Sequence, residues 1–499
     1  MRLKRALFFL SLLVLISCSS PDRTDDGIVI ALDSEPNRIN PLFLTDLNSH
    51  MISNIVFKGL VRINEKGVPE PELAKSWEIK NNGLEIVFHL RENVYWHDGE
   101  KFKAEDVIFT YELLISPQVA SPKKGVLGPV KEIKILNPHA IAVIYKEPYG
   151  SVLESWSIGI LPWHIGKKVL EPSFDKAPVG TGAFKLEKWN KGQFIILKAF
   201  DKFYSGKPKI NKFILKFIPD TTTKYLELKS GKIDVAELPS YIKTDELDNQ
   251  FNKYKADSFR YTCFGFNLNK HPFNDEKFRK AVAYSINKEE IINSVLKEGR
   301  ISLGPYPAST WYFNPEVKPY PYAPEKSKEI LKNTGISSLK FSLSVNSENK
   351  ELQRVAQFIQ HNLKNIGIET DIKLYDWQTF RHRMIEERAF DAVLLSRAYL
   401  WDPDIYDLWH SSKTGKGQWN FFSFKDKEVD SLLERGRKTL NFNERQRIYR
   451  ELHRLIYEKQ ACIFLYETPL VFYANKKIGG IAPDPRGMLY GIENWRQNH

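Results

Sequence analysis

Residues 74–114 constrain the fold of this chain more than any other stretch. Trp77 and Ile79 precede an Asn81-Asn82-Gly83 sequence, after which apolar residues alternate at Leu84, Ile86, Phe88 and Leu90. Asn-Gly pairs supply the positive φ angles of tight hairpin turns, and an apolar period of two gives each strand one buried face. The stretch therefore predicts a β-hairpin with one side packed against a core.

A helix is predicted directly after this hairpin. His97-Asp98-Gly99 predicts a second turn, and a helix begins at Lys103-Ala104-Glu105-Asp106. Its apolar residues Val107, Phe109, Leu113 and Leu114 lie along one side. Strand and helix patterns then alternate irregularly along the chain, without repeats, which indicates a mixed α/β fold.

Length and charge narrow the function classes. With 499 residues the chain is long enough for several domains or two large lobes. Lys and Arg number 73 against 61 Asp and Glu, a formal net charge of +12. The excess is dispersed in pairs such as Lys476-Lys477, without an Arg/Lys block or an RNA-binding motif, so nucleic-acid binding is not expected. A basic surface near anionic membrane lipid accounts for the charge more simply.

The N-terminus has the pattern of a targeting segment. Residues 1–17 combine an early positive charge with an apolar run that is too short to span a bilayer, as in a signal peptide. Leu15-Ile16-Ser17-Cys18 resembles the lipobox of bacterial lipoproteins, which implies that Cys18 is acylated and that residues 18–27 form a flexible leash. An ordinary secretory peptide with an incidental cysteine is the alternative.

Two cysteines remain in the mature chain, Cys263 and Cys462, both in apolar, strand-like segments. Two thiols in so long a chain do not form a disulfide framework, so buried free thiols are predicted. A disulfide between them is the alternative, because an exported protein meets oxidising conditions.

Several motifs together resemble the family of extracellular solute-binding proteins that carry oligopeptides, dipeptides and nickel for ABC importers. They recur in family order from about Ile28 to Phe472. The motifs are Ser76-Trp77, Phe88-His89-Leu90-Arg91, Asp98-Gly99, Ala104-Glu105-Asp106-Val107, Pro178 to Phe184, Ser230 to Asp234, Phe266 to Asn269, Arg279 with Ala281, and Tyr322 to Ser327.

The resemblance implies a two-lobed α/β periplasmic-binding-protein fold of class II (cluster C) with an extra inserted domain and a two-segment hinge. Residues 28–47, 177–264 and 470–499 would form lobe I, 48–176 the inserted domain and 265–469 lobe II. The hinge segments would be Cys263 to Asn267 and Leu465 to Leu470, with a cysteine near each.

Catalytic motifs are missing from the sequence. Gly-x-Ser-x-Gly, His-Glu-x-x-His and the Walker lysine do not occur. Gly180-Thr181-Gly182 lacks the third glycine of a nucleotide loop and precedes a strand, which favours a tight turn. No catalytic residue, metal site or cofactor is predicted.

The loop Ser396 to Asp404 is the predicted recognition element, because ligands of such folds bind beyond the carboxyl ends of strands. In peptide-binding members of the family, an aspartate three residues before an Asp-Pro pair holds the peptide amino group. Counting back from Asp402-Pro403, this chain has Tyr399 there. Either another acid serves, with Asp402, Asp404 and Glu35 as candidates, or the ligand lacks a free amino terminus.

Aromatic side chains are candidates for stacking on a ligand. Asn420 and Phe43 are further candidates, with turn formation and core packing as their alternatives. The complete predicted substrate-binding set is Tyr399, Trp401, Asp402, Trp419, Asn420 and Phe43.

The resemblance implies a monomeric, lipid-anchored binding protein that delivers an oligopeptide or dipeptide to ABC permease subunits in the membrane. A nickel chelate or an oligosaccharide is the alternative cargo. A periplasmic hydrolase and a sensor or assembly lipoprotein are the alternatives from other classes.

Overall fold

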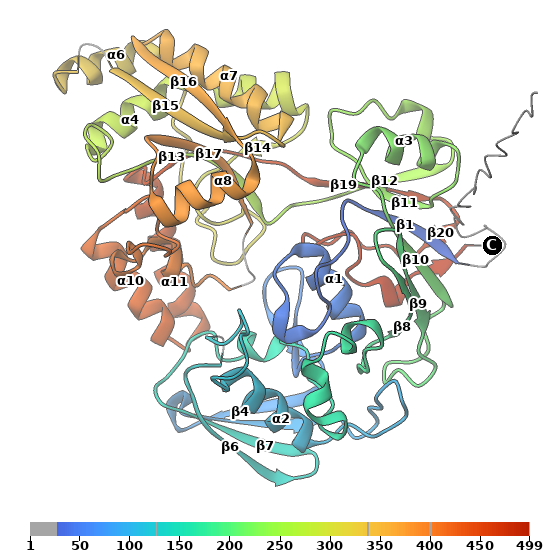
Figure 1. Ribbon diagram of the computed structural model, residues 1–499. Helices are drawn as coiled ribbons and strands as arrows, with labels where there is room; N and C mark the ends of the chain where they lie inside the picture. Colours follow the sequence, from blue (N-terminus) through green and yellow to red (C-terminus); the bar gives the residue numbers. More distant parts are fainter. Residues whose placement is uncertain (1–26, 126, 337–338, 399–401, 499) are drawn as a thin grey trace, which may run out of the picture.

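The computed structural model describes residues 27–125, 127–336, 339–398 and 402–498 (Figure 1). Its largest element is a seven-stranded sheet of order β12–β19–β11–β1–β10–β9–β8. In that order the strands are Phe251–Ala256, Leu470–Asn475, Val235–Glu237, Ile28–Leu32, Lys212–Phe217, Phe194–Ala199 and Phe184–Asn190. β1 is parallel to β10 and β11, and α3 (Thr221–Lys229) connects these two.

A six-stranded sheet forms the centre of a second body, in the order β14–β18–β13–β17–β15–β16. The strands are Arg300–Ile301, Ile463–Glu467, Arg260–Phe266, Ala392–Ala398, Leu339–Asn346 and Ile368–Tyr375. Its helices are α4 (Glu276–Ser285), α5 (Lys288–Ile291), α6 (Pro324–Asn333), α7 (Lys350–Lys364), α8 (Trp377–Arg381), α9 (Tyr406–Trp409), α10 (Lys427–Lys438) and α11 (Phe442–Glu458).

Residues 74–114 supply the first two strands of a four-stranded sheet, β4–β5–β7–β6, and α2 (Ala104–Ile115) beside it. Its strands are Ala74–Lys80, Glu85–Leu90, Ala140–Tyr145 and Val130–Asn137. Trp77 pairs with Phe88 across the predicted hairpin, whose turn residues all have positive φ. Leu84 departs from the prediction: its backbone is helical and belongs to the turn, so its side chain is exposed.

Short strand pairs complete the structure: β2 (Val61–Ile63) with β3 (Pro69–Pro71), and β20 (Ile478–Gly479) with β21 (Arg496–Gln497). The mixed α/β class predicted from the sequence is confirmed. No helix within the described ranges is long and apolar enough to cross a membrane.

The chain crosses twice between the two large sheets. β12 belongs to the seven-stranded sheet and β13 to the six-stranded one, so the first crossing is residues 257–259. The second crossing is residues 468–469, between β18 and β19, within the predicted segment Leu465 to Leu470. The predicted first segment, Cys263 to Asn267, and the boundary at 264 instead fall in and just after β13. An apolar strand there cannot be told from a hinge by its sequence.

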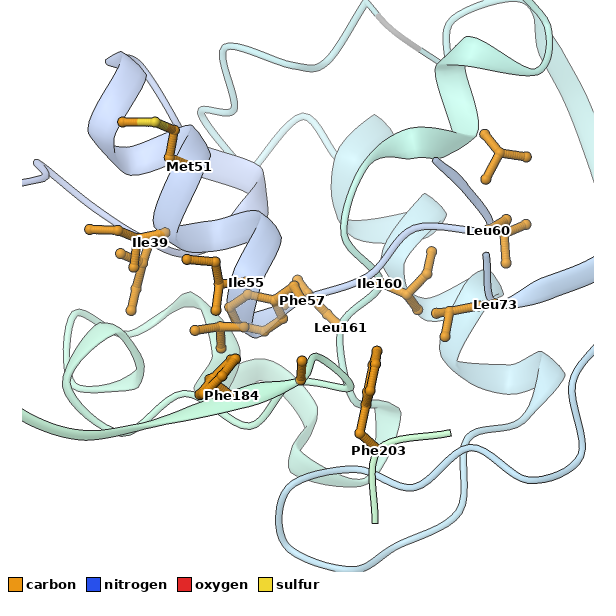
Figure 2. Close-up of a cluster of buried hydrophobic side chains, with 14 of the residues drawn as sticks. Ile39, Met51, Ile55, Phe57, Leu60, Leu73, Ile160, Leu161, Phe184 and Phe203 are labelled. Atoms are coloured by element: carbon orange, nitrogen blue, oxygen red, sulfur yellow. The ribbon is translucent and has the colours of Figure 1, made fainter. Parts of the chain in front are cut away.

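One hydrophobic core joins the seven-stranded sheet to the four-stranded sheet. Figure 2 shows Phe57, which follows α1 (Leu47–Val56), near Phe184 of β8 and Leu161, and Leu60 farther along the chain beside Leu73. The same cluster contains Phe88 of the hairpin and Trp495 near the C-terminus. Close-packed interiors resist deformation, so we expect the two sheets to move together as one unit. We call this unit the first body, and the six-stranded sheet with its helices the second body.

Gly180 and Gly182 are where the backbone touches α1 inside this core. A Cβ at either position would lie 1.9 Å from a main-chain oxygen, that of Val56 or of Ile55. Gly182 N–H donates to the Val56 oxygen, 2.9 Å away. The glycines therefore allow a close approach of two backbones, whereas the predicted tight turn is not present at either of them.

Candidate functional site

The two bodies meet at a buried ion cluster far from the crossings. Arg445 of α11 lies 3.0 Å from Glu154 and 2.9 Å from Asp402, and it also donates to Ser151 Oγ at 2.8 Å. Ser151 and Glu154 belong to the first body, whereas Asp402 and Arg445 belong to the second. We call these four residues the latch. In Figure 1, α10 and α11 lie beside the β4–β7 region at the lower left, whereas β12 and β19 lie at the upper right.

The electrostatics of the latch depend on its burial. Desolvation raises the pKa of the Glu154 carboxyl, and Arg445 opposes this rise. The two carboxylates in turn raise the pKa of the Arg445 guanidinium against its own desolvation. Arg445 and its carboxylate partners therefore offset part of the desolvation that burial imposes on this cluster. Separation of the bodies would return each of them to water.

A close backbone contact lies next to the latch. Gly150 N–H donates to the Arg437 main-chain oxygen at 2.5 Å. A Cβ at Gly150 would lie 2.8 Å from the main-chain oxygens of both Gly436 and Thr439, at the end of α10. A side chain at position 150 would therefore hold the bodies apart.

The neighbouring aspartate is also paired. Asp404 accepts from Arg437 Nε at 2.7 Å, and the Arg437 guanidinium lies 3.8 Å from the centre of the Tyr406 ring. Burial and the nearby Asp402 charge raise the pKa of Asp404, while Arg437 lowers it. Two of the three candidate acids for a ligand ammonium are thus engaged by arginines in this conformation.

The third candidate acid and Phe43 also have protein partners. Glu35 accepts from the indole Nε1 of Trp189 at 2.7 Å and from Gly192 N–H at 3.1 Å. Phe43 is half-buried, with the Arg38 guanidinium 4.1 Å from its ring centre. A role for either of them in ligand binding stays a prediction.

Trp419 and Asn420 are adjacent in sequence but differ in surroundings. The Trp419 side chain is 53% exposed, which leaves an aromatic face available to solvent. Asn420 is fully buried and its amide bonds the main chain of His410 and Phe424, which is the turn role that its alternative named. Tyr399, Trp401 and Cys18 lie outside the described residues.

Both remaining cysteines are buried and unbonded, as the free-thiol interpretation predicted. Cys263 lies in β13, and Cys462 lies directly before β18. Burial raises the pKa of the Cys462 thiol well above its ordinary value. A buried thiol with a raised pKa is a poor nucleophile, so Cys462 is unsuited to covalent chemistry.

A second cluster lies at the carboxyl ends of β1 and β11, beside the crossings. Lys224 of α3 is buried, forms an ion pair with Asp33 and donates to the Glu237 main-chain oxygen at 3.3 Å. Burial and the Asp33 charge raise the pKa of Glu237 to about 7, against the opposing effects of Arg260 and Lys224. Carboxyl ends of strands are where ligands bind in open α/β sheets.

The substitution Glu237→Gln tests the burial of this carboxyl through the pH dependence of the free energy of unfolding. The folded-state pKa of about 7 exceeds the ordinary value of 4.5, so the folded protein loses stability relative to the unfolded chain as the pH rises between these values. The glutamine variant should match the parent near pH 4.5 and exceed it at pH 8 by up to about 3 kcal/mol. Urea denaturation across this pH range measures the gap.

Glu325→Gln is the matched control for this pH series. Glu325 is an exposed glutamate of α6 in an i,i+3 pair with Lys328, and exposed pairs contribute about 0–1 kcal/mol. Its variant should follow the parent at every pH. A Glu237→Gln protein that is less stable than the parent at pH 8 would contradict the burial argument.

The roles of Arg445 and Gly150 were not predicted from the sequence, although the sequence contains one signal for Arg445. Arg445 stands three residues before Ile448 and seven before Leu452, in the buried stripe of α11. A charged residue in an apolar stripe indicates a buried ionic partner. Glu154 and Gly150 gave no such signal, because they lie in irregular structure.

Comparison with known proteins yields consistent matches along the chain. The family model described as "Bacterial extracellular solute-binding proteins, family 5 Middle" matches residues 68–419. The oligopeptide-binding protein AppA of Bacillus subtilis (strain 168) is 28% identical, over 96% of this chain and 93% of that protein. The dipeptide-binding protein of Escherichia coli (strain K12) is 24% identical, over 92% of each.

Solved structures share the fold across nearly the whole chain. AppA from Bacillus subtilis in complex with a nonapeptide has a TM-score of 0.80 at 27% identity, over 95% of this chain and 99% of that one. NikZ from Campylobacter jejuni in complex with Ni(L-His) has a TM-score of 0.83 at 30% identity, with the same coverage. The two-lobed fold predicted from the sequence is confirmed.

Proposed function

This chain belongs to the family 5 bacterial extracellular solute-binding proteins, and from that premise we propose that it captures an oligopeptide or dipeptide for an ABC importer. The observation that carries the proposal is the match to the nonapeptide-bound structure, which extends over 95% of the chain. The peptide-binding names of both curated relatives support the same cargo. We propose the division into lobe I, the inserted domain and lobe II given above, with the first crossing moved to residues 257–259.

Movement between the two bodies supplies the mechanism. The bodies are joined by two short crossings, and Ser258 Oγ donates to the Thr468 oxygen at 2.5 Å between them. Rotation about these segments opens the boundary and admits the ligand. Closure brings Arg445 to Glu154 and buries the ligand, and the closed form docks on the permease subunits. Capture and release of this kind need no catalytic group.

A nickel chelate is the second candidate cargo. The nickel–histidine-bound relative shares 30% identity with this chain, more than the nonapeptide-bound one. Tyr399, in the position where peptide-binding members have an aspartate, favours a ligand without a free amino group. The described residues contain no group of three or more His, Cys, Asp or Glu suited to a metal ion. A chelate brings its own ligands, so this cargo needs no such group.

We also propose export and attachment to the membrane. Cleavage before Cys18 and its acylation would leave eight residues between the anchor and Gly27. Two or three acyl chains hold a protein on a bilayer stably, because each buried methylene contributes about 0.8 kcal/mol. Mass spectrometry of the N-terminal peptide tests this proposal directly, since each acyl chain adds a defined mass.

Ligand identity is tested with protein purified without denaturation. Native mass spectrometry should reveal a co-purified ligand. Thermal-shift measurements with di- to pentapeptides, nickel–histidine and oligosaccharides then compare the candidate ligands. A ligand at 100 times its Kd stabilises the folded state by about 2.7 kcal/mol, which is a readily measured rise in Tm. Peptides should give this rise. A rise in Tm with nickel–histidine alone would contradict the peptide proposal and identify a nickel chelate as the cargo. Turnover of a peptide or an ester would indicate an enzyme instead of a binding protein.

A further inference from the structure

We propose that one end of the seven-stranded sheet is a docking surface for anionic phospholipid headgroups. This end is where the chain enters β1 from its N-terminal segment. The proposal rests on the lipid anchor proposed above and adds an orientation: it states which face of the protein lies against the membrane. We call the surface the basic rim. Its residues are Lys185, Lys198, Lys212, Lys232, Lys476, Lys477 and Arg496.

Strand register brings three of these lysines into one row. Lys185 of β8 pairs with Lys198 of β9, and Lys198 pairs with Lys212 of β10. Ile28 pairs with Phe213, so Gly27 follows Lys212 in the same row, and a Cβ on Gly27 would lie 3.5 Å from Lys212 Cγ. Like charges directly opposite each other destabilise a sheet. The register therefore concentrates three positive side chains at one end of the sheet.

The remaining strands end on the same side. Lys232 stands three residues before β11, which is parallel to β1, and Lys476-Lys477 directly follow the antiparallel β19. Asn498 N–H donates to the Lys477 oxygen at 2.7 Å, which places β21 and Arg496 beside them. Figure 1 shows β20 next to β1 and the C-terminal mark. Except for the partly buried Lys185 and Lys212, the rim side chains are exposed.

Acidic groups at this end are too few to neutralise the rim. Lys198 lies 3.7 Å from Glu187, and Asp201 is paired with Lys207. Asp234 accepts from Val29 N–H at 2.9 Å. Residues 198–212, between the row positions on β9 and β10, contain five lysines and only Asp201 as an acid. The entering segment contributes Asp22, Arg23, Asp25 and Asp26, a net charge of −2.

The basic rim lies where the N-terminal segment joins the sheet, which favours a membrane over a protein as its binding partner. An extended chain spans at most about 3.3–3.6 Å per residue, so the residues between Cys18 and Gly27 reach no more than roughly 30 Å. An acylated Cys18 therefore keeps the rim close to the bilayer. Asp33 and Glu237 lie at the opposite ends of β1 and β11, so the boundary between the two bodies faces away from the lipid.

Amine labelling of the acylated full-length protein in nanodiscs tests the orientation. One set of discs contains phosphatidylcholine alone and the other contains phosphatidylglycerol as well. Labelling of Lys198, Lys232, Lys476 and Lys477 should slow about fivefold in the anionic discs, from the typical attraction of one lysine to an anionic surface. High salt should abolish the difference. Lys332, Lys340, Lys350 and Lys364 of the second body should label equally in both.

A matched pair of quadruple variants separates the rim from the net charge. K198Q/K232Q/K476Q/K477Q should lose the lipid preference at its remaining rim lysines, Lys185 and Lys212. K332Q/K340Q/K350Q/K364Q, with the same net charge, should keep rim protection. Both should retain the thermal shift with ligand. Equal labelling of rim lysines in both discs, or their protection only after permease is added, would overturn the proposal.

The readouts also separate this proposal from the function proposed above. The mass of the Cys18 peptide reports the anchor, and the thermal shift reports the cargo, each independently of lysine protection. If Cys18 carries no lipid, sedimentation of the chain with phosphatidylglycerol vesicles at low salt becomes the measurement. Sedimentation that the rim variant loses supports the surface, and absence of sedimentation in the parent refutes it.

Discussion

Arg445→Met should weaken ligand binding by at least tenfold. The substitution leaves Glu154 and Asp402 buried without a counter-ion when the bodies close, and breaking a buried ion cluster in this way typically costs about 3–5 kcal/mol. In the open form both carboxylates are hydrated, so the cost falls on closure. Relaxation of the two carboxylates reduces this cost, so the expected loss of affinity is given as at least tenfold. Isothermal titration with the identified ligand measures the change.

Two further variants make this prediction specific to the latch. Arg454 lies on the same helix, α11, in exposed pairs with Glu451 and Glu458, so Arg454→Met should leave Kd unchanged. Gly150→Val should weaken binding as Arg445→Met does, because a side chain there meets the main chain of Gly436. A parent-like Kd for Arg445→Met would show that closure does not need the latch.

Acidification should distinguish the loss of a counter-ion in Arg445→Met from the steric obstacle in Gly150→Val. Burial raises the pKa of Glu154, so acid protonates this carboxyl and removes part of the buried charge, and the affinity of Arg445→Met should recover as the pH falls. Gly150→Val should show no such recovery, because its obstacle is steric.

Arg279→Met should lower the free energy of unfolding by about 3 kcal/mol or more. Its buried guanidinium donates to the Phe273, Lys459 and Gln460 main-chain oxygens at 2.8–3.0 Å, and it holds the C-terminal end of α11 against α4. Methionine fills similar space but leaves three buried carbonyls without donors, each costing about 1–3 kcal/mol. Guanidinium denaturation measures the loss.

Lys277→Met, on an exposed position of the same helix, is the control for Arg279→Met. It should change stability by less than about 0.5 kcal/mol, as surface substitutions usually do. A loss below 1 kcal/mol in Arg279→Met would indicate that water replaces the guanidinium at the three carbonyls. The motif around Arg279 and Ala281 would then have another explanation.

Local patterns predicted the local structure well. The Asn81-Asn82-Gly83 turn and the helix after Lys103 depend on φ angles and apolar periods that a few neighbouring residues determine. The first crossing was misplaced because β13 is buried and apolar throughout. A strand of that kind can belong to either sheet, and its apolar pattern does not show to which one.

The site was harder to predict than the fold for a physical reason. Arg445 acquires its role from Glu154, which is 291 residues earlier in the chain. Such a pair is created by tertiary packing and leaves no spacing to recognise. Motif reasoning found Asp402 but assigned it to a ligand, whereas in this conformation its carboxylate pairs with Arg445.

The shared core of the first body has a consequence for the order of folding. The six-stranded sheet is built from residues 260–467, so its pairings can form as soon as that segment is available. The seven-stranded sheet needs β1 and β19, and its core needs Trp495, from the two ends of the chain. Contacts this distant in sequence form slowly. We therefore expect the second body to fold first, and the first body to remain open to proteases until the C-terminal strand arrives.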